Sequence, residues 1–108
     1  MCSDKQPTPD HGTQEIDKLI HEPARLLIMA HLYVVESADF TYLMRQTNLT
    51  WGNLSSHMSK LEEAKYIQVI KEFKDRRPNT MLKLTGRGRS AFKRYRQQIL
   101  GVLEDLPE

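Results

Sequence analysis

Between Tyr66 and Leu84 the hydrophobic pattern of the chain changes from the spacing of helices to the composition of strands. The stretch from Tyr66 to Lys74 is rich in β-branched and aromatic residues, and Thr80 to Leu84 alternates apolar with polar residues. Asp75 to Asn79, which lies between them, has the composition of a turn. The sequence therefore predicts one antiparallel hairpin within an otherwise helical chain.

Two helical segments are expected before residue 38. Pro23 is suited to the first turn of a helix that ends near Ser37, and a buried stripe recurs at spacings of three and four. The stripe consists of Ala24, Leu27, Ile28, Leu32 and Val35. A shorter amphipathic helix is expected from Thr13, with Ile16, Leu19 and Ile20 on its apolar side, until Glu22-Pro23 interrupts it. Residues 1–12 are expected to form a flexible tail, and residues 13–108 a single domain.

A pair of helices joined by a tight turn is expected next. Asp39 and Thr41 are candidate caps of a short helix that stops at residues 47–50, and Thr50 can cap the helix that follows. Leu54, Met58, Leu61 and Lys65 share the inner face of this second helix. Its outward face is then short, polar and rich in hydrogen-bonding groups: Trp51, Asn53, Ser56, His57, Ser59 and Lys60. Such a face suits base edges of DNA.

The last helix is expected to begin after a Thr85 cap. Its apolar residues are spaced three, four, three and four, which is typical of a helix that pairs with another helix. This seam consists of Phe92, Tyr95, Ile99, Val102 and Leu106. Together with Ile16 and Leu19, it is our predicted surface for a homodimer.

Charge is unevenly distributed, although the net charge is only +2. Residues 65–96 carry eleven Lys and Arg against two Asp and Glu, whereas residues 1–64 carry five against nine. Phosphate neutralisation supplies most non-specific affinity for nucleic acid, so a block of this kind is where a polyanion would bind. A solvated helix face would account equally well for the charge density alone.

The order of these elements indicates an α+β, mostly helical fold: a winged helix-turn-helix with a two-stranded β-hairpin wing and a long C-terminal dimerisation helix. In this fold one helix enters the major groove, the preceding helix braces it, and the hairpin reaches the backbone or the minor groove. The chain resembles the MarR/ArsR-like winged helix-turn-helix transcriptional regulators in three segments, which follow one another in the order of that family. These segments are HEPARLLIMAHL, LTWGNLSSHMSKLEEAKYIQVIKEF and DRRPNTMLKLTGRGRSAF. The resemblance covers roughly Ile20 to Tyr95 and implies a recognition helix over about Trp51 to Ala64.

We therefore expect a sequence-specific regulator of double-stranded DNA, of repressor type, that acts as a homodimer. The candidate DNA contacts are Trp51, Asn53, Ser56, His57, Lys60, Lys74, Arg76 and Arg77. Three alternatives to a DNA contact stay open: an ordinary exposed histidine at His57, an indole of Trp51 packed on the wing or the previous helix, and, for Arg25, a salt bridge to Glu22 or another nearby acid instead of a contact with the DNA backbone. A winged-helix module that binds another protein is the alternative function.

Other classes of function find little support. The chain lacks a nucleophile with a base, a glycine-rich phosphate loop and paired acids, so we expect no enzyme and no cofactor. The lone Cys2, and the ten-residue separation of His21 and His31, do not favour a metal site. No apolar run reaches the length of a membrane span, and we expect a cytoplasmic protein. A small-molecule effector remains open.

Overall fold

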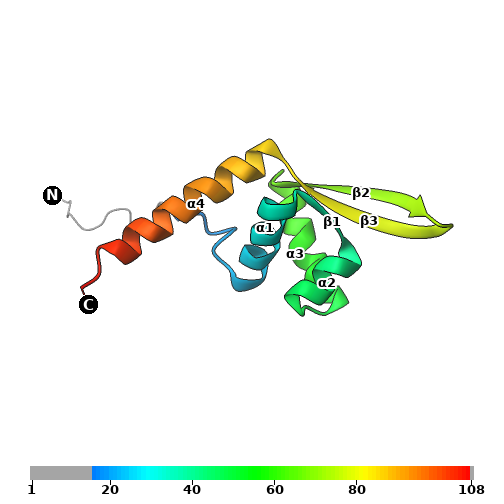
Figure 1. The fold of residues 1–108 in the computed structure, drawn as a ribbon, viewed down its shortest axis with the longest axis horizontal. Coiled ribbons are helices and arrows are strands. Elements are labelled where there is room, and N and C mark those ends of the chain that lie inside the picture. Colours follow the sequence, from blue (N-terminus) through cyan, green and yellow to red (C-terminus); the bar gives the residue numbers. More distant parts are fainter. Residues whose placement is uncertain (1–15, 108) are drawn as a thin grey trace.

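The computed structural model describes residues 16–107 and forms four helices and three strands within that range (Figure 1). In chain order the elements are α1 (Pro23–Val35), β1 (Ser37–Asp39), α2 (Phe40–Thr47), α3 (Trp51–Glu63), β2 (Ile67–Lys74), β3 (Arg77–Leu84) and α4 (Gly86–Glu104). The expected tail over residues 1–12 lies outside the described residues. The α+β winged-helix architecture expected from the sequence is confirmed.

Side-chain caps fix where the helices begin. The Asp39 carboxylate accepts a hydrogen bond from the Tyr42 N–H at 2.7 Å and so starts α2. Thr50 and Thr85 do the same for α3 and α4, through bonds from the N–H groups of Asn53 (3.2 Å) and Gly88 (2.9 Å). Each cap satisfies a donor that the first turn of a helix leaves free.

The sheet has the strand order β1-β3-β2 and is antiparallel throughout. The predicted hairpin is therefore present as β2 and β3, below called the wing, but β1 adds a third strand that the sequence did not indicate. The turn of the wing is also shorter than predicted: it consists of Asp75 and Arg76 alone, and both have positive φ (53° and 67°). That backbone is the one a two-residue type I′ hairpin requires.

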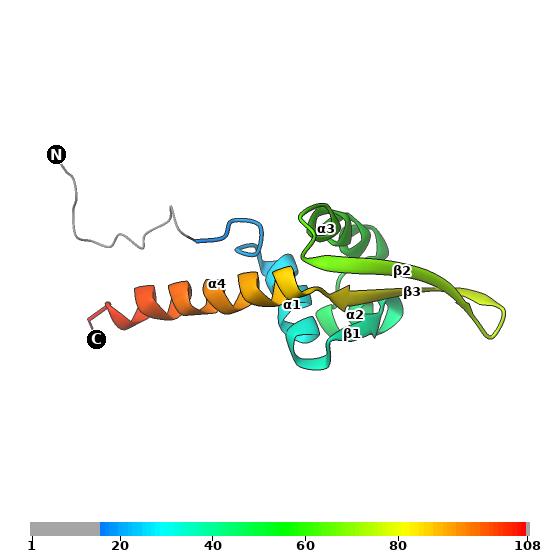
Figure 2. The same cartoon turned by 90° about the horizontal axis from the view of Figure 1, so that it is seen from above.

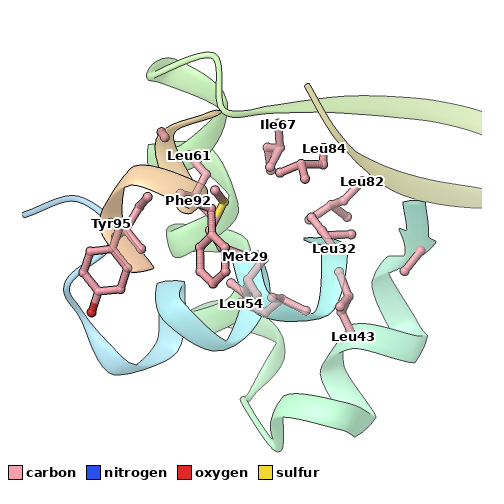
Figure 3. Packing of buried hydrophobic residues seen from close by; sticks show 14 residues of the cluster. Met29, Leu32, Leu43, Leu54, Leu61, Ile67, Leu82, Leu84, Phe92 and Tyr95 are labelled. Carbon is pink, nitrogen blue, oxygen red and sulfur yellow. The ribbon is translucent and has the colours of Figure 1, made fainter. Parts of the chain in front are cut away.

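The core lies where α1, α3, the start of α4 and the base of the wing meet (Figure 3). Met29 and Leu32 come from α1, and Leu54 and Leu61 from α3; all four side chains are fully buried. The wing contributes Leu82, and the remaining members of the core are Ile20, Ile28, Ala38, Leu43, Ile67, Leu84, Ala91, Phe92 and Tyr95. Burial of this set anchors the inner face of α3 and leaves its other side free.

The segment before α1 differs from its prediction. Within the described part, residues 16–20 form a bend and a turn instead of a helix. The Asp17 carboxylate explains the difference, because it accepts hydrogen bonds from the N–H groups of Leu19 (3.0 Å) and Ile20 (3.3 Å) and so closes a tight turn. Its second oxygen accepts a bond of 2.6 Å from the Tyr66 hydroxyl. Burial and this bond raise the pKa of Tyr66 to about 12.

Helix α4 leaves the body of the domain in the direction opposite to the wing, as both views show (Figures 1 and 2). Its first turns are packed, with Phe92 and Tyr95 only 9% and 5% exposed in the chain's own core. Leu106, at the far end of the seam, is 60% exposed. The seam is therefore divided between an inner part already used by the core and an outer part that is open. None of the helices in residues 16–107 combines the length and apolar character of a membrane span.

Candidate nucleic-acid interface

The outward face of α3 presents a row of exposed polar side chains. Asn53, Ser56 and Lys60 are all exposed. They follow each other at i, i+3 and i+7, so they share one side of the helix. Their placement follows from Leu54 and Leu61, which hold the opposite side in the core. The outward orientation predicted for these three residues is confirmed.

Trp51 stands at the first turn of α3. Its ring lies 5.8 Å from the ring of Phe40, the first residue of α2, at an interplanar angle of 52°. Of the two packing partners that the sequence left open, the previous helix is the one observed. The indole nevertheless remains 67% exposed, so it is available at the surface beside the polar row.

A groove of about 260 Å³ separates α3 from the wing. Trp51, Ser55 and Met58 line it from the helix, and Lys71 and Thr80 line it from the strands. Phe40, Thr41, Pro78 and Asn79 complete its lining. Helix α3 and the wing therefore border one open surface. Ser55 belongs to this surface but was not predicted, since it lies on the boundary between the inner and outer faces of the helix.

The wing carries exposed cations at its tip. Lys74 and Arg77 are the last register pair of the hairpin, and Arg76 occupies the turn between them. All three are exposed. In contrast, Arg89 in the first turns of α4 is turned inward, with its guanidinium carbon 4.7 Å from the centre of the Tyr33 ring and a nitrogen 3.4 Å from the Glu36 carboxylate. The basic block therefore divides into exposed cations on the wing and at least one that braces α4 against α1.

His57 differs from its neighbours on α3. Its side chain is only 19% exposed, and Nδ1 lies 3.0 Å from Nη1 of Arg25 in α1. The guanidinium of Arg25 also donates through Nε to the carbonyl oxygen of Leu19 at 2.6 Å. Glu22 is not the hydrogen-bond partner of the guanidinium, because its carboxylate caps α1 by accepting from the Arg25 backbone N–H at 2.9 Å. Burial opposes ionisation of Glu22, but this bond and the nearby guanidinium of Arg25 lower the pKa of its carboxyl.

In the part of the chain that the structure describes, no three His, Cys, Asp or Glu side chains are grouped so that they could hold a metal ion. The interface is instead one of hydrogen-bonding groups and cations: a polar helix face, an open groove and a cationic hairpin tip. Such a set can contact base edges with the helix and phosphate oxygens with the hairpin.

A helix-turn-helix followed by a hairpin that shares its surface defines a winged-helix DNA-binding protein. The chain belongs to the winged helix DNA-binding domain family, which matches residues 24–102. It is 38% identical over 89 residues to the protein MJ0432 of Methanocaldococcus jannaschii, which spans 82% of this chain and 97% of that protein.

Solved structures share this fold. The transcriptional regulator homologue of Pyrococcus horikoshii is 32% identical, with a TM-score of 0.78 over 83% of this chain and 91% of that one. YusO of Bacillus subtilis shares the fold at 23% identity, with a TM-score of 0.68 over 84% of this chain and 67% of that one. The resemblance to MarR-like winged-helix regulators is thereby confirmed.

Proposed function

We propose that this protein is a sequence-specific, double-stranded DNA-binding transcriptional regulator, of repressor type, that acts as a homodimer in the cytoplasm. The observation that carries the proposal is the groove between α3 and the wing, which Trp51 and Ser55 line from the helix and the exposed cation Lys71 lines from the wing. A relative at 32% identity described as a transcriptional regulator homologue supports it.

The proposed mode of binding assigns different tasks to the two elements. Helix α3 enters the major groove, where Asn53 and Ser56 can donate to and accept from base edges. The wing lies on the backbone or in the minor groove, where Lys74, Arg76 and Arg77 meet phosphates. Lys60, the last residue of the polar row, and Trp51, beside the row at the first turn of α3, contact the backbone in this mode.

Salt dependence tests this mode. Neutralising one phosphate releases about 0.9 counterions, so the double variant Arg76→Ala, Arg77→Ala is expected to reduce the slope of log K against log salt by about 2 per protomer, and so by about 4 for a dimer that binds through both wings. Affinity should fall on every sequence, while the preferred sequence stays the same. The matched control is Lys93→Ala, Arg96→Ala, which removes two exposed cations from α4 and should leave the slope unchanged. Binding that does not depend on salt would contradict the proposal.

Base recognition is tested separately. Asn53→Ala should relax the sequence preference, measured by selection of bound fragments from a random DNA pool, because the amide is the residue expected on a base edge. In a homodimer the selected motif should be a pseudo-palindrome whose half-sites lie one helical turn, about 34 Å, apart. An asymmetric motif would count against the dimer.

The dimer is proposed to form through the outer part of α4. There Leu100 and Leu103 are 45% and 55% exposed on a helix that projects from the domain (Figure 1), and Leu106, just beyond the end of the helix, is 60% exposed. Apolar side chains in such a row gain free energy when a second helix covers them. Leu103→Glu with Leu106→Glu should therefore yield a monomer in sedimentation analysis. Gln97→Glu with Ser90→Glu, which adds the same charge at exposed positions of α4, should leave the dimer intact.

A further inference from the structure

The link between Arg25 and His57 joins two elements of the DNA-binding unit that are 32 residues apart in the chain. Arg25 belongs to α1, and its guanidinium is held at two points, the Leu19 carbonyl oxygen and Nδ1 of His57. A guanidinium fixed in this way has little freedom to leave the histidine. The ring of His57 is therefore held by a contact that comes from α1, outside its own helix.

The chemistry of this contact decides where the His57 ring carries its proton. A guanidinium has only donors, so Nδ1 of His57 must be the acceptor at 3.0 Å. An acceptor nitrogen carries no hydrogen, and the neutral ring then holds its proton on Nε2. The Glu22 carboxylate lies 3.9 Å from Nδ1, beyond hydrogen-bond distance, and does not offer this nitrogen a competing acceptor.

The opposite nitrogen of the ring faces solvent. Among the residues that the structure describes, Gln98 Oε1 is the one buried side-chain oxygen or nitrogen that has no hydrogen-bond partner. Nε2 of His57 makes no hydrogen bond either, so it must be accessible. His57 therefore presents to the outside a single N–H donor and no acceptor.

The position of His57 around α3 indicates what this donor meets. Ser55, which lines the groove beside the wing, precedes His57 by two residues, and this places the two about 200° apart around the helix axis. Asn53, Ser56 and Lys60 lie between them on the exposed side. When this exposed side enters a major groove, a residue on the flank next to α1 faces the sugar-phosphate wall.

We propose that Arg25 acts as a positioning residue that holds the His57 ring with Nδ1 as the acceptor and the proton on Nε2, and that this outward N–H donates to a phosphate oxygen of the DNA backbone. A phosphate oxygen is only an acceptor, so it matches a group that is only a donor. The inference rests on the proposed function, and it assigns His57 to the backbone instead of the base-reading set expected from the sequence.

The first test uses the wild-type protein without DNA. Long-range proton–nitrogen NMR distinguishes the two ring tautomers, and the His57 signal is assigned by its loss in His57→Gln. We expect the proton on Nε2 in the wild type, a mixture of tautomers in Arg25→Met, and recovery in Arg25→Lys, which restores a donor. A wild-type ring protonated mainly on Nδ1, or an Arg25→Met spectrum like the wild type, overturns the proposal.

The second test uses DNA. His57→Leu, which removes the donor, should weaken binding roughly 10-fold on a selected site and on a scrambled one alike, the loss of about one hydrogen bond to a charged group. The salt slope should not change, because a neutral ring displaces no counterion. His57→Gln keeps an N–H at similar reach and should recover part of the affinity. The control Ser59→Ala, at an exposed residue of the same helix, should show no such loss on the scrambled site.

The outcomes separate this inference from the proposed function. A changed preference at one base pair in His57→Leu, or an unchanged affinity, overturns the phosphate contact while the regulator assignment stands. Absence of DNA binding by the wild type overturns the proposed function, and with it the role of His57 on DNA. The tautomer spectra of the wild type, Arg25→Met and Arg25→Lys still decide the role of Arg25 in that case, and they do not depend on whether His57→Leu folds.

Discussion

Gly88, in the first turn of α4, lies directly against the backbone of Tyr66, the residue before β2. A Cβ at position 88 would overlap the Tyr66 carbonyl oxygen, and Cδ1 of Leu84 would lie 3.0 Å from it. The same oxygen accepts a hydrogen bond from the Thr85 backbone N–H (3.1 Å), and the Thr85 hydroxyl, 3.0 Å from it, lies still closer to the Lys65 carbonyl oxygen (2.7 Å). Since the obstacle is a backbone group held by its own bonds, it cannot rotate away as a side chain would.

Gly88→Ala is therefore expected to lower the free energy of unfolding by about 2 kcal/mol. Overpacking of a tight site costs roughly 1–3 kcal/mol, and this contact belongs to the upper end of that range. The better helix propensity of alanine returns at most about 1 kcal/mol of it. In a chain of 108 residues the net loss corresponds to a fall in Tm of roughly 10 °C. Urea unfolding followed by far-UV circular dichroism, at one fixed protein concentration, measures it.

The same substitution in the same helix provides the control. A Cβ at position 101 would meet no atom within 4 Å other than those of its chain neighbours and of the backbone of its own helix, so Gly101→Ala should gain helix propensity without a clash. The expected gain is about 0.5–1 kcal/mol. The two variants should thus shift the unfolding midpoint in opposite directions. If Gly88→Ala is as stable as the wild type, the close approach of α4 to Tyr66 is not what fixes this corner of the fold.

Three further predictions concern single side chains. Thr50→Ala removes the cap of α3 and should cost about 1 kcal/mol in urea unfolding, whereas Thr50→Ser should cost much less. Leu54→Ala empties a fully buried position and should cost about 2–5 kcal/mol; a smaller loss than that of Thr50→Ala would refute the assignment of Leu54 to the core. Because burial and the Asp17 bond raise the pKa of Tyr66 to about 12, from an ordinary value of 10.0, this contribution to stability is complete below pH 10 and is lost as the pH rises to 12. Unfolding measured across that range should show the loss, and Tyr66→Phe should show less of it.

Local signals were sufficient for most of the fold. Asp39, Thr50 and Thr85 are helix caps that need only the next three residues to act, and all three were predicted and are confirmed. β1 escaped prediction because three residues, Ser37–Asp39, are too few for a pattern of alternation. Its existence depends on pairing with β3, from Ser37 opposite Lys83, which lies 46 residues later. Such a long-range pairing leaves no trace in the local sequence.

In contrast to β1, which was present but not predicted, the helix around Ile16 to Ile20 was predicted but is not present. The apolar spacing of this segment is helical, but the short side chain of Asp17 offers the backbone a competing partner and closes a turn. The periodicity of α3 correctly placed Asn53, Ser56 and Lys60 outward, and their contacts with DNA stay a prediction. The periodicity of α3 could not reveal that His57 is half-buried, because its contact with Arg25 comes from another helix.

At position 76, in the turn of the wing, the residue that would favour folding differs from the residue that the proposed DNA contact requires. Arg76 has a φ of 67°, a conformation that glycine adopts freely and that costs a side-chain-bearing residue on the order of 1 kcal/mol. Glycine at position 76 would therefore make the hairpin more stable and at the same time remove its outermost cation. A library screened for heat resistance should accumulate glycine there, whereas one screened for retention on DNA at raised salt should keep arginine. On the proposed mode of binding, a form stabilised by glycine at position 76 would accordingly be a weaker binder of DNA.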